Sequence, residues 1–353
     1  MRKVKNLVKA LLPQSLLHFI WYAQYFYWSR TSKYIKKVNS VTLETTNLCD
    51  IHCTVCAIPQ LRRKKGFLTL EDFKIIFGRL PPSVKNLRMN YSGEPLLNKA
   101  IFQMVKHAKE LRPEVDIRIS TNGTHLGNFP PEEITASGLD ELDICLDGPT
   151  KEIHEEYRRG SDFDKITAAA KRLCEYKSRS GAVTPRIIQM TLLNKKTAPF
   201  IPQITALAAE IGFDELQLRY MGIPPLTCPA PLLRKLYTYY ATLSDEEMGS
   251  FAERYFTEDE YSLYRKTAGA YAVKKEMKKC FSFISPVIYY NGDVSVCCHD
   301  GEGAAVFGNI LKEDFTSVMK KMPAADVYDK KLEICRDCDL SWMGVNFQTL
   351  KLK

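Results

Sequence analysis

The sequence has no uninterrupted apolar run of the roughly 18 residues that a membrane-spanning helix requires. It also lacks the glycine-rich patterns GxxxxGK[ST] and GxGxxG, so nucleotide hydrolysis is unsupported. No internal repeat or low-complexity tract occurs. What is left is an ordinary folded chain, because 353 residues with 45% hydrophobic content suffice for one large domain and a smaller one.

Acidic residues are absent from the first 40 positions, which hold eight lysines and arginines. These eight residues account for most of the net charge of +9, since the rest of the chain has 42 basic and 41 acidic residues. The body of the protein is therefore close to neutral. We expect no nucleic-acid partner, because such partners require a basic surface on the folded domain.

The basic segment, residues 1–39, is also rich in aromatic and leucine side chains. Polar residues and one proline interrupt it: Pro13, Gln14, Ser15, His18 and Gln24. This mixture suits an interfacial helix on anionic headgroups, and it equally suits a helix packed on the protein or on a partner. A signal peptide is not expected, because no small-residue cleavage site follows Trp21. We expect a cytoplasmic protein, either free or peripheral on the inner face of the membrane.

Three of the eleven cysteines, Cys49, Cys53 and Cys56, lie within eight residues at CxxxCxxC spacing, directly after a β-branched run at 40–43. Such close spacing indicates metal binding in a reducing cytosol rather than disulfides. Thiolates are soft ligands for iron-sulfur clusters and for zinc. Three of them around a cubane leave one iron without a protein ligand, whereas a partial zinc site is the alternative interpretation.

A second group of cysteines lies near the C-terminal end: Cys280, Cys297, Cys298, Cys335 and Cys338. Two strand patterns about Asn291-Gly292 predict a hairpin that brings Cys280 and Cys297 together. The CxxC pair at 335 and 338 can bind one metal centre from a single turn. On spacing alone, two such pairs suit zinc and a [4Fe-4S] cluster equally well.

Between the two cysteine groups, short strand patterns alternate with longer helical patterns, which is typical of a parallel α/β sheet. Strands are expected at residues 40–44, 86–91, 116–121, 141–146, 186–193 and 215–220. Helices are expected at residues 70–80, 98–111, 151–157, 163–177 and 201–211. In such sheets ligands collect at the carboxyl ends of the strands, so the turns after the strands are the candidate binding elements.

Two of these turns suit ligand binding. The second strand ends in a tight Ser-Gly-Glu-Pro turn at 92–95, whose acid can accept hydrogen bonds from a cation. The third strand ends in the Asn-Gly turn of residues 120–123. After the fourth strand, a lone His154 on a helix is expected to be structural, and Cys145 to be a small buried packing group.

The cysteine triplet and these two turns together resemble the radical S-adenosylmethionine (radical SAM) enzymes. The resemblance implies an α/β fold, a partial (β/α)6 TIM-like barrel, with one [4Fe-4S] cluster held by the triplet and SAM bound beside it. The implied SAM contacts are Ser92, Gly93, Glu94, Pro95, Ser120 and Asn122. Two positions depart from the family pattern: Val55 stands where an aromatic residue is usual, and Ser92 replaces the first glycine of Gly-Gly-Glu-Pro.

The C-terminal cysteines, with Gly292 and the Gly308-Asn309-Ile310 segment between them, resemble the extension called SPASM. No cysteine follows Cys338, so the pattern is closer to the shortened form called twitch, which holds one auxiliary [4Fe-4S] cluster. Its implied ligands are Cys280, Cys297, Cys335 and Cys338, with Cys298 as a substitute for its neighbour. The implied organisation is a barrel at 40–225, a helical bridge at 226–275 and a small cysteine-rich auxiliary-cluster domain at 276–353.

The resemblance implies reductive cleavage of SAM to a 5′-deoxyadenosyl radical that abstracts hydrogen from a substrate, with a flavodoxin- or ferredoxin-type electron donor. A fully ligated auxiliary cluster suits acceptance of a second electron, which favours oxidation or modification of a small polar or glycan-type substrate, lipid-linked if the N-terminal segment binds membrane. The alternative is maturation of a ribosomal peptide or a protein side chain. An alternative of another class is a non-enzymatic zinc-binding interaction protein. No catalytic residue is identified from the sequence.

Overall fold

The computed structural model describes residues 14–54, 56, 58–194, 196–220, 280, 282–298, 300–329, 331–332 and 348–351. The helical bridge expected at 226–275 lies outside the described residues, as do Cys335 and Cys338.

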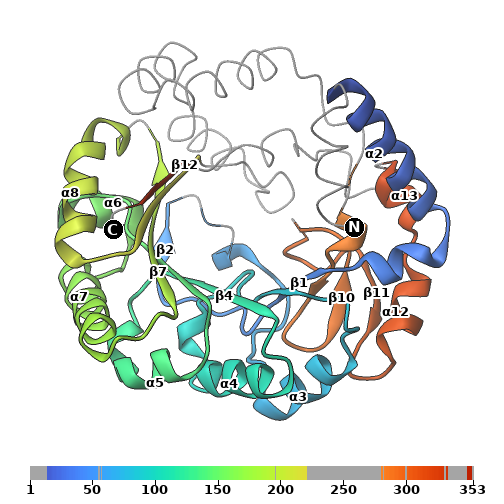
Figure 1. Cartoon of the computed structure of the whole chain (residues 1–353), viewed down its shortest axis with the longest axis horizontal. Coiled ribbons are helices and arrows are strands. Elements are labelled where there is room, and N and C mark those ends of the chain that lie inside the picture. Colours follow the sequence, from blue (N-terminus) through green and yellow to red (C-terminus); the bar gives the residue numbers. More distant parts are fainter. Residues whose placement is uncertain are drawn as a thin grey trace.

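The six expected strands form the centre of one sheet. They are β1 (Ser40–Leu43), β3 (Asn86–Arg88), β4 (Asp116–Thr121), β5 (Glu141–Cys145), β7 (Arg186–Leu193) and β8 (Glu215–Tyr220). Each of the six pairs in parallel with the next of the six along the chain. The expected partial (β/α)6 barrel is therefore confirmed, and Figure 1 shows the sheet curving inside a ring of helices.

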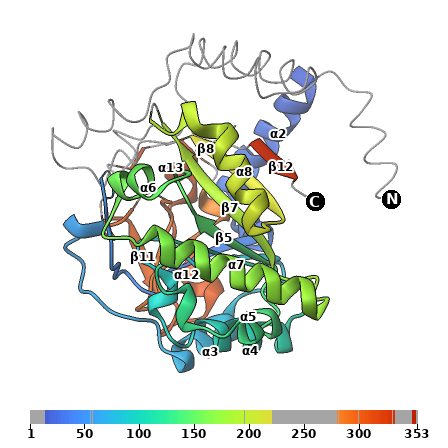
Figure 2. The same ribbon diagram turned by 90° about the vertical axis from the view of Figure 1, so that its left-hand side faces the viewer.

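Helices cover the convex face of this sheet (Figure 2). They are α3 (Leu70–Arg79), α4 (Ile101–Leu111), α5 (Pro131–Ala136), α6 (Lys151–Tyr157), α7 (Phe163–Ser180) and α8 (Ile201–Ile211). Short 3-10 turns lie between the elements: η2 (Ile58–Gln60), η3 (Pro95–Leu97), η4 (Leu126–Asn128) and η5 (Ala198–Phe200). Side chains point alternately to the two faces of the sheet along each strand. Leu87, Ile117 and Ile119 are buried against the helices, and the residues next to them in the sequence face the concave side.

The C-terminal domain extends the same sheet. Its elements are η6 (Ser282–Ile284), β9 (Val287–Ile288), β10 (Asp293–Ser295), β11 (Val306–Asn309), α12 (Phe315–Lys321) and α13 (Ala324–Tyr328). The expected hairpin is present: β9 and β10 are antiparallel, and Gly292 takes the left-handed conformation (φ 84°) that the turn requires. β9 pairs in parallel with β1, and β12 (Gln348–Lys351) pairs antiparallel with β8, so the sheet has ten strands.

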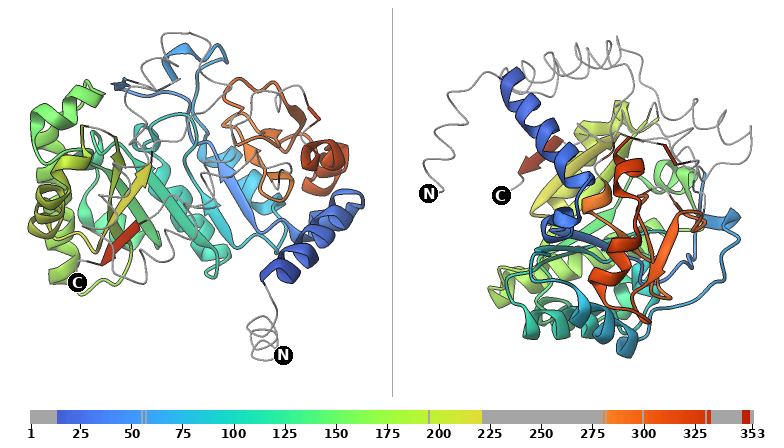
Figure 3. Two further views of the ribbon diagram at one scale, coloured as in Figure 1. Left: turned by 90° about the horizontal axis from the view of Figure 1, so that it is seen from above. Right: turned by 90° about the vertical axis from the view of Figure 1, so that its right-hand side faces the viewer.

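The N-terminal segment forms α2 (Gln14–Ser29) and the 3-10 turn η1 (Ser32–Lys37). The α2 helix lies beside α13 (Figures 1 and 3). The Phe26 and Tyr328 rings meet edge-on, and Arg30, just after α2, forms an ion pair with Asp329 at 2.5 Å. The helix thus packs on the C-terminal domain. Within the described part of the chain, no helix has the length and apolar character needed to span a membrane.

Candidate cluster and cofactor site

The loop that follows β1 carries the three cysteines of the first group. It is held by the short strand β2 (His52–Cys53), which pairs antiparallel with β6 (Arg158–Arg159), and by a hydrogen bond of 2.9 Å from Thr54 N to Tyr157 O. All three thiols are half-buried, and the thiol of Cys56 acts electrostatically on the other two. Cys49, Cys53 and Cys56 thus lie on one loop at the carboxyl end of β1.

The surroundings of these thiols fit a metal cluster as ligand. Burial raises the pKa of Cys49 to about 12 and that of Cys53 to about 11, so protons must leave when a metal binds. Two side chains donate to the sulfurs: Asn122 Nδ2 lies 3.8 Å from Cys49 Sγ, and Arg158 Nη1 lies 3.9 Å from Cys53 Sγ. Among the described residues, no three His, Cys, Asp or Glu side chains lie close enough together to hold a single metal ion. In a cubane each iron takes its own thiolate, so the sulfurs need not converge on one point.

The Ser-Gly-Glu-Pro turn after β3 is fixed against the cysteine loop. Glu94 N donates to Leu48 O at 2.7 Å. A Cβ atom at Gly93 would lie 2.4 Å from Thr46 O and 2.5 Å from Leu48 O, which is closer than any side chain can approach. Glycine is therefore required at this position because the two backbones touch.

The Glu94 carboxyl group is buried at the junction of three elements. Its Oε1 accepts from Thr121 Oγ1 at 2.5 Å and from Leu96 N at 2.9 Å, and its Oε2 accepts from Asn122 N at 2.7 Å. Burial raises its pKa to about 7 despite these donors. Since a carboxylate has about four acceptor positions, the protein occupies three and leaves about one for a ligand.

The turn after β4 lies beside the cysteine loop as well. Asn122 Nδ2 donates to Asp50 Oδ1 at 3.0 Å, and Thr124 Oγ1 donates to Asp50 Oδ2 at 2.5 Å. Ser120 lies on the concave face, 3.8 Å from the buried Cys145 sulfur. Asp50 was not singled out from the sequence. Its position directly after Cys49 was the available signal.

A buried ion pair next to Cys53 was also missed by sequence reasoning. Arg158 Nε lies 2.6 Å from Asp147 Oδ2, and Asp147 Oδ1 accepts from Leu192 N at 2.7 Å. His154 is fully buried, and its Nδ1 accepts from Asp147 N at 3.2 Å. Burial lowers the pKa of His154 to about 3, so the ring is neutral and orders this loop, in line with the expected structural role.

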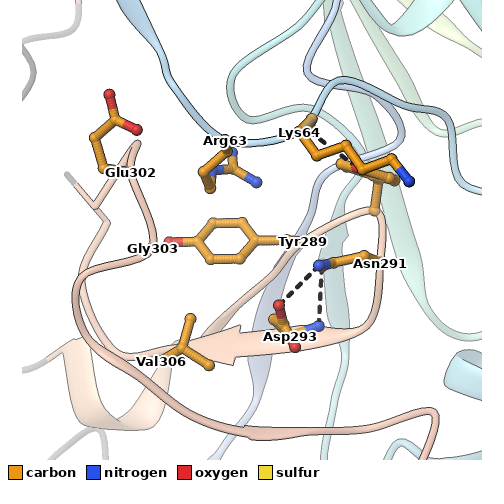
Figure 4. Close-up of a pocket in the computed structure, with 9 residues that line it drawn as sticks. Arg63, Lys64, Tyr289, Asn291, Asp293, Glu302, Gly303 and Val306 are labelled. Carbon is orange, nitrogen blue, oxygen red and sulfur yellow. Dashed lines mark hydrogen bonds between the residues drawn. The ribbon is translucent and has the colours of Figure 1, made fainter.

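Arg63, in the segment after the cysteine loop, joins the barrel to the C-terminal domain. Its guanidinium makes a bidentate contact with Glu44, at 3.0 Å from Nη1 and 2.7 Å from Nη2, and Nε donates to Gly301 O at 2.5 Å. It lies 4.1 Å from the Tyr289 ring centroid (Figure 4). The pocket drawn there, about 200 Å³, lies between Lys64, the β9–β10 hairpin and Glu302, and is part of this domain contact.

The described cysteines of the second group are Cys280, Cys297 and Cys298. Cys280 is buried with its sulfur 2.9 Å from Ser282 Oγ, whereas Cys297 and Cys298 are half-buried. Burial raises the pKa of Tyr91, and the charges of Tyr289, Cys297, Asp300 and Cys298 add to that shift. Tyr91, which directly precedes the Ser-Gly-Glu-Pro turn, is therefore close to Cys297 and Cys298.

A partial parallel barrel with three thiols at the carboxyl end of its first strand is typical of α/β-barrel enzymes that depend on an iron-sulfur cluster. Comparison with known proteins agrees: residues 43–198 match the family model of the radical SAM superfamily, and residues 280–339 match SPASM, an iron-sulfur cluster-binding domain. The chain belongs to the radical SAM superfamily and is an enzyme with a C-terminal SPASM-type domain. The cofactors of this family are a [4Fe-4S] cluster and SAM, with auxiliary iron-sulfur clusters in the SPASM domain. The zinc-binding interaction protein is thereby set aside.

Similar sequences include GTP 3',8-cyclases. That of Peptoclostridium acidaminophilum is 24% identical over 54% of this chain, and this chain spans 57% of its length. That of Clostridium botulinum strain Hall is 25% identical over 72% of this chain and 76% of the relative.

Similar solved structures confirm the fold. The structure of anSMEcpe with AdoMet (SAM) and the Cp18Cys peptide has a TM-score of 0.58, with 16% identity over 87% of this chain and 88% of that one. Streptococcus suis SuiB bound to its precursor peptide SuiA has a TM-score of 0.57, with 16% identity over 86% of this chain and 70% of that one.

Proposed function

We propose that Cys49, Cys53 and Cys56 hold the [4Fe-4S] cluster to which SAM binds. The support is their common position at the mouth of the barrel and the donors that Asn122 and Arg158 aim at two of the sulfurs. The SAM contacts are the turn residues named from the sequence: Ser92, Gly93, Glu94, Pro95, Ser120 and Asn122. When bound, the cluster and SAM supply a 5′-deoxyadenosyl radical that takes a hydrogen atom from the substrate.

The second part of the proposal assigns one auxiliary [4Fe-4S] cluster to Cys280, Cys297, Cys335 and Cys338, as acceptor of the second electron of an oxidation. Tyr91 and Tyr289 support it, because their rings, 5.9 Å apart, lie between the end of β3 and Cys297. A flavodoxin- or ferredoxin-type protein donates the first electron. The protein acts in the cytoplasm, with α2 available to a membrane surface.

The substrate class that we propose is a small polar molecule of sugar or glycan type. One observation carries it: the concave face of the sheet, which we call the barrel lumen, presents polar and charged side chains. They are Arg88, Arg118, Ser120, Glu141, Asp143, Gln217 and Arg219. A closed TIM barrel fills this space with bulky aliphatic residues instead. The GTP named for the curated relatives is likewise small and polar.

A peptide or protein side chain is the second candidate substrate. It is favoured by the similar solved structures, in which anSMEcpe and SuiB hold peptides. The two candidates differ in the size of the molecule that must reach the lumen. Stimulation of 5′-deoxyadenosine formation by the low-mass fraction of a cell extract supports the first, and stimulation by the peptide fraction supports the second. Extract from cells grown in D2O adds a direct check, because the true substrate transfers deuterium to 5′-deoxyadenosine.

Cysteine variants test the cluster assignment. Cys53→Ala is expected to abolish 5′-deoxyadenosine formation from SAM and dithionite, whereas Cys280→Ala is expected to reduce iron from about eight to about four per chain. Cys174→Ala is the matched control, because Cys174 is buried in the helix layer on α7. Unchanged product formation in the Cys53 variant would remove the first assignment.

A further inference from the structure

Three arginines of the concave face are already paired with carboxyl groups. Arg118 Nη1 lies 3.2 Å from Glu141 Oε1, and Arg186 also forms an ion pair with Glu141. Arg219 Nη2 lies 3.3 Å from Asp143 Oδ2. Burial raises the pKa of Asp143 to about 6, so this carboxyl group is still mostly ionised at neutral pH. Each of these three arginines is therefore already paired with a carboxyl group of this face.

Arg88 is a fourth arginine on the same face. Its strand position pairs with Thr42 on one side and with Arg118 on the other. The charges that act on it include Arg219 on β8 and Asp143 on β5, which are not neighbours of β3 in the sheet. Side chains of separated strands can approach only across the concave side of a curved sheet, so Arg88 points into the lumen.

The Arg88 guanidinium has no acceptor within the described part of the chain: no hydrogen bond, ion pair or ring contact joins it to another described residue. The side chain stays open to solvent even though protein surrounds it, which is typical of a residue lining an open cavity. Burial and the nearby Arg219 both lower its pKa, so this cation is held in an unfavourable place. A guanidinium presents five donors in a planar fork that suits phosphate and carboxylate groups.

We propose that Arg88 binds an anionic group of the substrate, either a phosphate or a carboxylate, on the floor of the lumen. This inference rests on the proposed use of the lumen as the substrate site and narrows the substrate class to negatively charged molecules. Arg88 is the last residue of β3, and Ser92 follows four positions later, at most roughly 14 Å away along the chain. An anion bound at Arg88 would therefore leave the remainder of a small substrate within reach of the Ser-Gly-Glu-Pro turn.

The test uses the full chain with its clusters reconstituted anaerobically, and inorganic phosphate, pyrophosphate and succinate as probes. Isothermal titration measures binding of each probe to the unaltered protein and to Arg88→Gln. Loss of charge-assisted hydrogen bonds should weaken the preferred probe about 10- to 100-fold. Arg88→Lys keeps the positive charge but lacks the planar guanidinium, so its affinity for the probe should lie between those of the unaltered protein and Arg88→Gln. Arg172→Gln, an exposed position on α7, is the control and should bind like the unaltered protein.

The identity of the tighter probe distinguishes a phosphate site from a carboxylate site, and either result supports the proposal. Equal binding by Arg88→Gln and the unaltered protein would overturn it, as would the absence of binding of all three probes to the unaltered protein. Arg88→Lys guards against a folding artefact, because partial recovery of binding requires a folded chain. SAM cleavage by the unaltered protein is measured separately, so failure of the proposed enzymatic function is distinguished from failure of the anion site.

Discussion

The contact between Arg63 and Glu44 gives a sharp prediction on stability. The Glu44 side chain is 0% exposed and that of Arg63 13%. Burial opposes the charge on Arg63, yet hydrogen bonds to Glu44 raise its pKa above the ordinary value. Arg63→Met keeps much of the side-chain volume but leaves the buried carboxylate with one backbone donor, Tyr290 N at 3.4 Å. Breaking a buried pair from one side costs about 3–5 kcal/mol, which we expect for this variant.

A double-mutant cycle separates this electrostatic cost from lost packing. Replacing both partners, Glu44→Met with Arg63→Met, removes the uncompensated charge and should recover about half or more of the loss. The assay is urea unfolding of the anaerobic, reconstituted chain, followed both by fluorescence and by cluster absorbance. Arg172→Met, on the exposed face of α7, should change the free energy of unfolding by no more than about 0.5 kcal/mol. A single variant that costs under about 1 kcal/mol, or a double variant whose loss equals the sum of the singles, would refute the reasoning.

Two further predictions concern the Ser-Gly-Glu-Pro turn and the N-terminal segment. Gly93→Ala should cost about 1–3 kcal/mol and prevent SAM binding by equilibrium dialysis, because its Cβ meets two backbone oxygens. Gly78→Ala on α3, where nothing lies within 4 Å of the added atom, should bind SAM normally, and equal effects of both changes would contradict this. The chain should co-sediment with vesicles of anionic lipid. The double change Lys33→Gln with Lys36→Gln, at two exposed positions of η1, should weaken vesicle binding about 30-fold. Equal binding of the unaltered chain to neutral vesicles would contradict this prediction.

Local sequence patterns predicted much of the barrel. The strands at 116–121, 186–193 and 215–220 have the expected bounds, since short runs with regularly spaced apolar residues between turns are a local signal. The start of α7 is set by Asp162, whose side chain accepts from Lys165 N, and its end by Gly181 in the left-handed conformation. The six-residue α5 was missed because so short a helix carries too little periodicity to be recognised.

Long-range pairings had no such signal. The hairpin at 287–295 was predicted, but its attachment to β1 joins residues more than 240 positions apart and leaves no local trace in the sequence. The same is true of Arg63 with Gly301 and of Arg88 facing Arg219, because each depends on how strands are ordered in the sheet. The cysteine triplet was recognisable because its three residues lie in one loop. The ion pair of Asp147 and Arg158 could be connected with Cys53 only once the structure showed how close they lie.

The parallel pairing of β9 with β1 constrains how the two cysteine groups can move. Thr42 N donates to Pro286 O at 3.1 Å and Glu44 N donates to Ile288 O at 2.8 Å, so one backbone ladder joins the segments that precede Cys49 and Cys297. A hinge between the barrel and the C-terminal domain would have to break this ladder. Electron exchange between the two metal centres would then take place across a constant gap, and its rate should be insensitive to solvent viscosity.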